Sequence, residues 1–190
     1  MNKKSADVAA NTARNTARHT ASDSPSNNRI IRASAAPAVY GTVDPKDVAD
    51  LSGLDFFEGM ASGRYPAPPI AQTLNFNFVE AEHGRAVFEG TPLRAFYNPI
   101  GSIHGSYAAA LLDSCMGCAV HTTLAAGQAY TTLEYKISLV RGMSDQTGKV
   151  TAEGRVMQVG RRVASAEGWL RDAAGKLLAH GTTTCLVFEV

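Results

Sequence analysis

The stretch from Ile103 to Leu124 is apolar or small at nearly every position. Its residues are mostly Ala, Leu, Cys, Met, Val and Gly, so a helix formed here has no polar face to turn toward water. Such a helix must be covered by the rest of the fold. Asp113 lies in the middle of this stretch. Because burying a carboxylate without a partner is costly, Asp113 is a candidate for a chemical role.

Alternation of apolar and polar residues predicts strands on both sides of this helix. The clearest is 131–140, in which Leu133, Tyr135, Ile137 and Leu139 alternate with polar residues. Two strands are predicted before the helix, at 71–80 and 85–91, and three more after it, at 149–159, 163–172 and 177–190. We expect the four strands after the helix to form a meander. The fold class is therefore α+β, with one curved antiparallel sheet of about six strands around one long central helix.

The N-terminal part of the chain has a different composition. Residues 1–42 contain almost no large apolar residue before Ile30, so we expect a disordered tail and a folded domain spanning 43–190. At the start of that domain, Asp44 and Pro45 precede spaced apolar residues up to Met60. This pattern predicts a short amphipathic helix with Asp44 as its N-cap, ending at Gly63.

The charge of the chain is unevenly distributed. The net charge is +1, but residues 1–32 hold six Lys or Arg against two Asp (+4), and the other 158 residues hold twelve basic against fifteen acidic residues (−3). A mildly acidic domain does not favour nucleic-acid binding. There is no run of apolar residues long enough to span a membrane, so we expect no membrane association.

Three cysteines, Cys115, Cys118 and Cys185, are too few and too irregular for a disulfide framework. Cys115 and Cys118 have CxxC spacing and His121 follows, so a redox or metal site must be considered. A reactive CxxC pair needs a helix N-terminus, and a structural zinc needs a fourth ligand. We therefore expect buried, reduced cysteines, no bound metal and a cytoplasmic protein.

Asn98, His104-Gly105 and Asp113, followed by a Thr-rich strand start and Gly160-Arg161 in a hairpin, resemble the PaaI-like branch of hotdog-fold acyl-CoA thioesterases. The resemblance extends from about residue 51 to the C-terminus. It implies a hotdog fold and hydrolysis of an acyl- or aryl-acyl-CoA to the free acid and CoA. No cofactor is implied beyond the CoA of the substrate.

The chain departs from the family pattern at two positions. Ser106 stands where the family usually has a second glycine, and Cys115 where it often has alanine. A serine is tolerated in the first helical turn, so the expected fold is unaffected. The shape of the pocket near the helix start is the feature that Ser106 changes.

The resemblance assigns the chemistry to the start and the middle of the helix. Asp113 is the general base for water, or a nucleophile that forms a mixed anhydride; both remain open. The backbone N–H of Gly105, at the positive end of the helix, polarises the thioester carbonyl and holds the developing oxyanion. The plain alternative for Asp113 is a structural hydrogen bond where the helix meets a partner.

The other candidate residues have supporting roles. Asn98 positions the carbonyl or the water through its amide, and His104 fixes the loop by hydrogen bonding. For either residue, capping of the helix is an equally simple interpretation. Thr132 can orient the water, with Thr131 as the alternative. An ordinary strand position is the simpler interpretation of Thr132.

The spacing of His104 and Asp113 argues for a site shared between subunits. They are nine residues apart, which is about 13 Å along a helix axis. One thioester carbonyl cannot contact both in a single chain. Antiparallel pairing of two helices brings Asp113 of one subunit toward Gly105 of the other. The resemblance implies such a homodimer, and we expect a homotetramer of two dimers.

Gly160, Arg161 and Arg162 form a tight turn between two strands. The resemblance implies that they contact the phosphates of CoA, for which the guanidinium group is suited. Two solvated charges in a turn are the alternative.

Three other functions were weighed against a thioesterase. The first is a hotdog protein that binds or senses acyl-CoA without catalysis. The second is an enoyl-CoA hydratase, which is disfavoured because its Asp and His are arranged differently. The third is a serine hydrolase, but residues 101–105 lack the G-x-S-x-G pattern.

Overall fold

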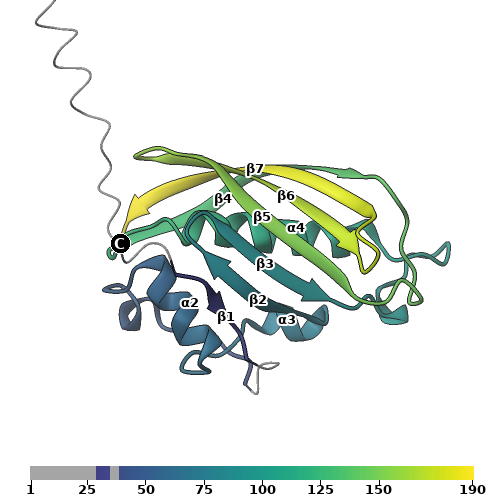
Figure 1. Ribbon diagram of the computed structural model, residues 1–190, viewed down its shortest axis with the longest axis horizontal. Coiled ribbons are helices and arrows are strands. Elements are labelled where there is room, and N and C mark those ends of the chain that lie inside the picture. Colours follow the sequence, from purple (N-terminus) through teal and green to yellow (C-terminus); the bar gives the residue numbers. More distant parts are fainter. Residues whose placement is uncertain (1–28, 35–38) are drawn as a thin grey trace, which may run out of the picture.

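The computed structural model describes residues 29–34 and 39–190 and shows a sheet wrapped around one long helix (Figure 1). Within this part of the chain the sheet has seven strands in the order β1-β2-β3-β5-β6-β7-β4, and all neighbours are antiparallel. The strands are β1 Ile31–Arg32, β2 Phe76–Glu82, β3 Arg85–Gly90, β4 Gln128–Leu139, β5 Val150–Val159, β6 Val163–Asp172 and β7 Leu177–Glu189.

The four strands after the helix do not form the simple meander that the sequence predicted. β5, β6 and β7 are joined by hairpins, but β5 pairs with β3, and β4 pairs with β7 at the far end of the sheet. The central helix α4 (Gly105–His121) explains this order. It packs across β3, β5, β6, β7 and β4. The segment that follows α4 therefore joins the sheet at the edge farthest from β1 and β2, and β4 becomes an edge strand.

A row of glycines lets α4 lie close to the sheet. Gly154, Gly168 and Gly181 are directly opposite one another on β5, β6 and β7. A Cβ atom on Gly154 would stand 2.2 Å from the carbonyl oxygen of Cys115, and one on Gly168 would stand 2.8 Å from Cγ of Met116. These side-chain-free positions form a groove for the middle of α4, where the core is most deeply buried.

The folded part of the chain includes residues that lie within the expected N-terminal tail of 1–42. Residues 1–28 and 35–38 lie outside the described residues. Ile31–Arg32 forms the edge strand β1, in which Ile31 pairs with Ala81 and is buried. A buried Ile31 adds to the core, so the described structure begins within the expected tail.

The single helix predicted after Asp44 is two elements. Asp44 caps a 3-10 turn, η2 (Pro45–Asp47), as expected, but that turn ends at Val48. Ser52 then caps α2 (Gly53–Ala61) by accepting a hydrogen bond from the Asp55 N–H. A second serine cap thus starts a second helix in the same apolar pattern.

The first predicted strand begins five residues later than expected. Residues 69–73 form a short helix, α3 (Pro69–Thr73), with Pro69 in its first turn, a position that suits proline. β2 begins only at Phe76, after Asn75 with its positive φ of 51°. A 3-10 turn, η3 (Arg94–Phe96), leads from β3 toward α4. In Figure 1, α2 and α3 lie beside β1 and β2.

None of the helices in the described part of the chain is both long and apolar enough to cross a membrane.

Candidate active site

Asp113 lies midway along α4 and its carboxylate is held by a threonine from the neighbouring strand. Thr132 of β4 donates a hydrogen bond from Oγ1 to Asp113 Oδ1 over 3.1 Å. Both side chains are partly buried, whereas Thr131 is exposed. Of the two threonines that the sequence left open, Thr132 is therefore the one in contact with Asp113.

Asp113 and Thr132 form part of the wall of a cavity of about 570 Å³, which we call the Asp113 cavity. This volume is within the range of about 300–1,000 Å³ that is usual for small-molecule sites. Much of the rest of the lining comes from the segment 41–69, which precedes β2, and it is largely apolar. Residues that contribute are Val48, Phe56, Phe57, Met60 and Pro66.

One face of α4 supplies further polar groups to the same cavity. Ser114, Cys118 and His121 line it, together with Tyr130 of β4. The CxxC region was expected to be buried filler, but Cys118 and His121 face a cavity. The signal was the spacing: Asp113 and His121 are eight residues apart, and Ser114 and Cys118 are four apart, which places them on one helical face.

His121 is enclosed by aromatic rings. Its ring centroid lies 5.3 Å from that of Phe56, 5.7 Å from Phe57 and 5.6 Å from Tyr130. Burial lowers the pKa of His121 to about 4, so the imidazole is neutral near pH 7. Burial also raises the pKa of the Cys118 thiol to about 12. Neither group brings a charge into the cavity, which leaves Asp113 as its acidic side chain.

The N-terminus of α4 presents a backbone donor away from Asp113. His104 is the N-cap, and its Nδ1 accepts a hydrogen bond from the Ser106 N–H over 3.1 Å. Among the hydrogen bonds of the described residues, the N–H of Gly105 has no acceptor. It therefore remains free for a ligand at the positive end of the helix.

Asn98 organises the loop that precedes α4. Its side-chain oxygen accepts hydrogen bonds from the N–H groups of Ile100 and Ser102, and its amide nitrogen donates to Ser102 Oγ over 2.9 Å. The side-chain oxygen of Asn98 is therefore occupied by hydrogen bonds within its own loop. His104 is fixed to the same region through its own N–H, which donates to the carbonyl of Phe96.

A single chain brings Asp113 and Thr132 together but not the other candidates. Asn98, His104 and Gly105 do not line the Asp113 cavity. Gly105 precedes Asp113 by eight residues on one helix, which corresponds to about 12 Å along its axis. The separation inferred from spacing is thus present in the structure.

Measured along the strands, the turn between β5 and β6 lies at the same end of the sheet as the first residues of β4. Arg161 and Arg162 are exposed, and the Arg162 carbonyl accepts a hydrogen bond from the Val187 N–H over 2.9 Å. Val187 is opposite Tyr130 on β4. Gly160 closes the turn by donating to the Val163 carbonyl. The two arginines do not line the Asp113 cavity of their own chain.

The described residues contain no group of three or more His, Cys, Asp or Glu side chains arranged to hold a metal ion. The three cysteines are all unpaired thiols, and Cys115 and Cys185 are buried, as expected.

Comparison with known proteins identifies the family. A family model described as the thioesterase superfamily matches residues 100–179. A phenylacetic acid degradation-related protein from Ralstonia eutropha is 30% identical, with a TM-score of 0.63 and coverage of 69% of this chain and 98% of its own. The chain belongs to the thioesterase superfamily. Its PaaI-like character, its hotdog fold and its class of enzyme, a thioester hydrolase, are thereby confirmed.

Two more distant matches share the fold of this thioesterase. The Escherichia coli PaaI protein is 18% identical with a TM-score of 0.62, and the match covers 74% of this chain and 96% of that one. A Streptococcus mutans protein solved with acetyl-CoA bound is 23% identical with a TM-score of 0.55, and coverage is 60% and 90%. Curated protein sequences gave no significant match.

The family match places the two halves of the Asp113 cavity in different parts of the thioesterase. Residues 100–179 include Gly105, Asp113 and Thr132. The largely apolar segment 41–69 lies outside that match. Asp113 and Thr132 thus belong to the matched region, and much of the apolar lining of the cavity is contributed upstream of it.

Proposed function

We propose that this thioesterase hydrolyses an acyl- or aryl-acyl-CoA to the free acid and CoA, with Asp113 as the reacting carboxylate. The observation that carries the proposal is the placement of Asp113. Its carboxylate is held by Thr132 at the wall of a largely apolar cavity of about 570 Å³. An acyl group suits the apolar wall, and the carboxylate is within the same cavity to act on its thioester.

The chemistry requires water and a base. Asp113 removes a proton from a water molecule, and the hydroxide attacks the thioester carbonyl carbon. Collapse of the tetrahedral intermediate breaks the C–S bond and expels the CoA thiolate, which takes the proton back from Asp113. In the alternative, Asp113 attacks directly, and water then hydrolyses the mixed anhydride. Both routes convert acyl-CoA and water into acid and CoA with no further cofactor.

Thr132 supports either route. Its hydroxyl donates to Asp113 Oδ1, which fixes the orientation of the carboxylate and leaves the other oxygen for water or the carbonyl carbon.

The oxyanion donor in this proposal comes from a second subunit. Gly105 N–H is free in its own chain but is about 12 Å from Asp113 along the helix axis. In an antiparallel homodimer, Gly105 of one protomer approaches Asp113 of its partner, and a peptide N–H at a helix start stabilises the developing oxyanion. The homotetramer implied by the family resemblance would join two such dimers.

The edge strand β4 supports pairing between copies. Its outer edge has no strand neighbour among the described residues. Leu133, Tyr135 and Leu139 on this strand are 48–60% exposed. An unpaired edge with exposed apolar side chains favours association. β4 also carries Thr132, so pairing here places the interface beside Asp113.

The CoA portion is proposed to extend toward Arg161 and Arg162. Both are exposed on the β5–β6 turn, which lies at the same end of the strands as the first residues of β4. Their guanidinium groups suit phosphate, and a protein of similar fold binds acetyl-CoA. Asn98 and His104 are proposed to hold the loop before α4, so that Gly105 N–H keeps its direction.

Thiol release from a panel of acyl-CoA and aryl-acyl-CoA esters tests this function. The native chain should release CoA, and Asp113→Asn should lower kcat by about 10³-fold or more while CoA esters still bind. Asp50→Asn is the matched control, because Asp50 is exposed and does not line the cavity. Binding of CoA esters without thiol release by the native chain would instead favour the non-catalytic binding protein. Full activity of Asp113→Asn would refute the site.

A further inference from the structure

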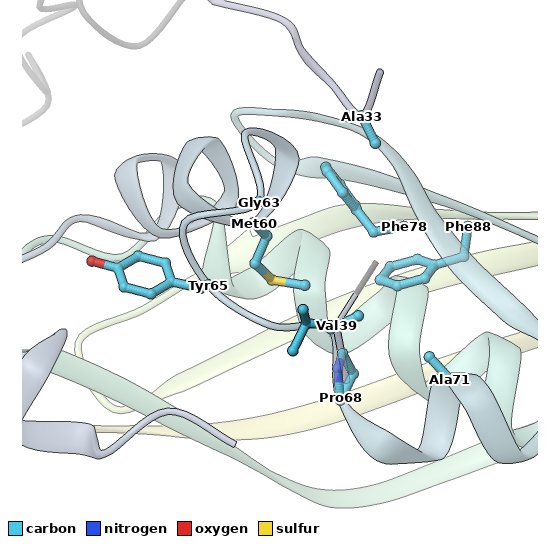
Figure 2. Close-up of a pocket in the computed structure, with 10 residues that line it drawn as sticks. Ala33, Val39, Met60, Gly63, Tyr65, Pro68, Ala71, Phe78 and Phe88 are labelled. Atoms are coloured by element: carbon cyan, nitrogen blue, oxygen red, sulfur yellow. The ribbon is translucent and has the colours of Figure 1, made fainter. Parts of the chain in front are cut away.

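A second, smaller apolar pocket adjoins the Asp113 cavity. It has a volume of about 90 Å³ and lies between α2, α3 and the β2–β3 pair. Its walls include Val39, Met60, Pro68, Ala71, Phe78 and Phe88 (Figure 2). We call it the tail pocket.

The tail pocket and the Asp113 cavity share part of their walls. Met60, Pro68 and Phe88 line both. Two ring pairs continue the common wall. Phe57 of the Asp113 cavity packs against Phe78 of the tail pocket, with ring centroids 5.1 Å apart. Phe76 of the Asp113 cavity packs against Phe88 in the same way at 6.0 Å. The two spaces are therefore neighbours separated by a few side chains.

Met60 has the most rotatable bonds of the three side chains that line both spaces. Figure 2 shows its side chain reaching from α2 into the pocket, between Tyr65 on one side and Phe88 on the other. Met60 is only partly buried. An unbranched thioether side chain has three rotatable bonds and adapts to what it packs against. A change of rotamer at Met60 is thus the simplest way to connect the two spaces.

The chemistry of the tail pocket selects an apolar occupant. Its lining side chains are aliphatic or aromatic apart from the phenol of Tyr65. The described residues place no charged side chain in its wall. Such a pocket offers few hydrogen-bond partners to water, whereas every methylene group buried there is favourable by transfer from water.

We propose that the tail pocket receives the distal end of an unbranched fatty acyl chain whose thioester lies at Asp113. The chain runs along the apolar wall of the Asp113 cavity, passes Met60, and ends against Ala71 and Phe78. This inference rests on the proposed function and gives it a substrate class: fatty acyl-CoA esters long enough to reach past Met60. Met60 and Ala71 are then specificity-determining residues from the segment upstream of the family match.

A chain-length series tests the proposal. We measure kcat/KM for straight-chain acyl-CoA esters from C4 to C16 with the native chain and with Ala71→Leu. Ala71 is buried and lines only the tail pocket, so a leucine there fills it without touching the Asp113 cavity. In the native chain each methylene should raise kcat/KM by up to about fourfold. In Ala71→Leu, the C4 ester should react as before. The rise in kcat/KM from the methylene groups that would enter the tail pocket should disappear.

A second variant and a control separate the possible failures. Met60→Ala removes the partition and should move the best substrate to a longer chain. Ile70→Ala changes an exposed position of the same short helix α3 and should leave the profile unchanged. If Ala71→Leu does not fold, Met60→Ala decides. Identical chain-length profiles in the native chain and both pocket variants would overturn the proposal. Absence of thiol release from every ester by the native chain would overturn the proposed function instead.

Discussion

The hydrogen bond from Thr132 to Asp113 distinguishes two adjacent threonines that the sequence could not separate. Thr132→Val removes the donor while keeping the shape of the side chain. Because hydrogen bonds to charged groups contribute about 1.5–3 kcal/mol, we expect kcat to fall by at least about tenfold with little change in KM. Thr131→Val is the matched control, since Thr131 is exposed. Equal kinetics for the two variants would show that Thr132 is only a strand residue.

His121 gives the folded state a defined dependence on pH. Its pKa falls from 6.5 to about 4 on burial, so between these values the unfolded chain binds the proton and the folded chain does not. The contribution of His121 to the free energy of unfolding is therefore fully present above pH 6.5. It decreases by roughly 3 kcal/mol as the pH falls to 4.

Urea unfolding of the native chain and of His121→Gln, each from pH 7 to pH 4, measures this contribution. The carboxylates titrate in both proteins, so the difference between the two curves isolates His121. We expect that difference to change by roughly 3 kcal/mol across the window, in favour of the variant at low pH. Parallel curves would contradict a buried, neutral imidazole.

At the scale of elements, the glycine row on β5, β6 and β7 determines how closely α4 approaches the sheet. Gly154→Ala places a Cβ against the Cys115 backbone, which cannot move away as a flexible side chain can. We expect a loss of about 1–3 kcal/mol or more, seen as a fall in Tm of several degrees. Gly142→Ala is the control, because nothing lies within 4 Å of its added Cβ. A Tm equal to that of the control would contradict the close packing.

Elements with a strong local pattern could be predicted from the sequence, and those set by tertiary packing could not. The helix around Asp113 and the strands of the β5–β6–β7 hairpins lie close to their predicted bounds. The position of β4 beside β7 depends on how α4 crosses the sheet, which periodicity does not encode. The break at Ser52 comes from a serine cap, and the short helix at Pro69 starts with a proline in its first turn. Both lie within a pattern that also fits one helix or a strand.

The candidate site also has one part that the sequence predicts and another that depends on tertiary packing. Asp113 was recognisable because a carboxylate interrupts an apolar helix. Its contact with Thr132, and the presence of Cys118 and His121 in the cavity, depend on which face of α4 meets β4 and the segment 41–69. That segment could not be assigned to the site from sequence, because its apolar residues are equally suited to an ordinary core.

At the scale of the whole molecule, one active site of the proposed enzyme needs two chains. Within one chain, Asp113 has a cavity and a threonine partner, whereas the free N–H of Gly105 lies about 12 Å from it along the helix axis. Gly105→Pro removes that N–H while respecting the helix, because Gly105 is its first residue and His104 before it is extended (φ −61°, ψ 138°). Gly105→Ala is the control, which adds the same Cβ beside Leu139 but keeps the N–H.

Subunit mixing tests this central claim most directly. Asp113→Asn and Gly105→Pro chains, each inactive alone, are mixed, allowed to exchange and assayed for thiol release, with exchange followed by labels on the two chains. A hybrid dimer then holds one site with both defects and one with neither, so equal mixing should restore about a quarter of the native activity. Exchange of labels without any return of thiol release would show that each chain carries a complete site.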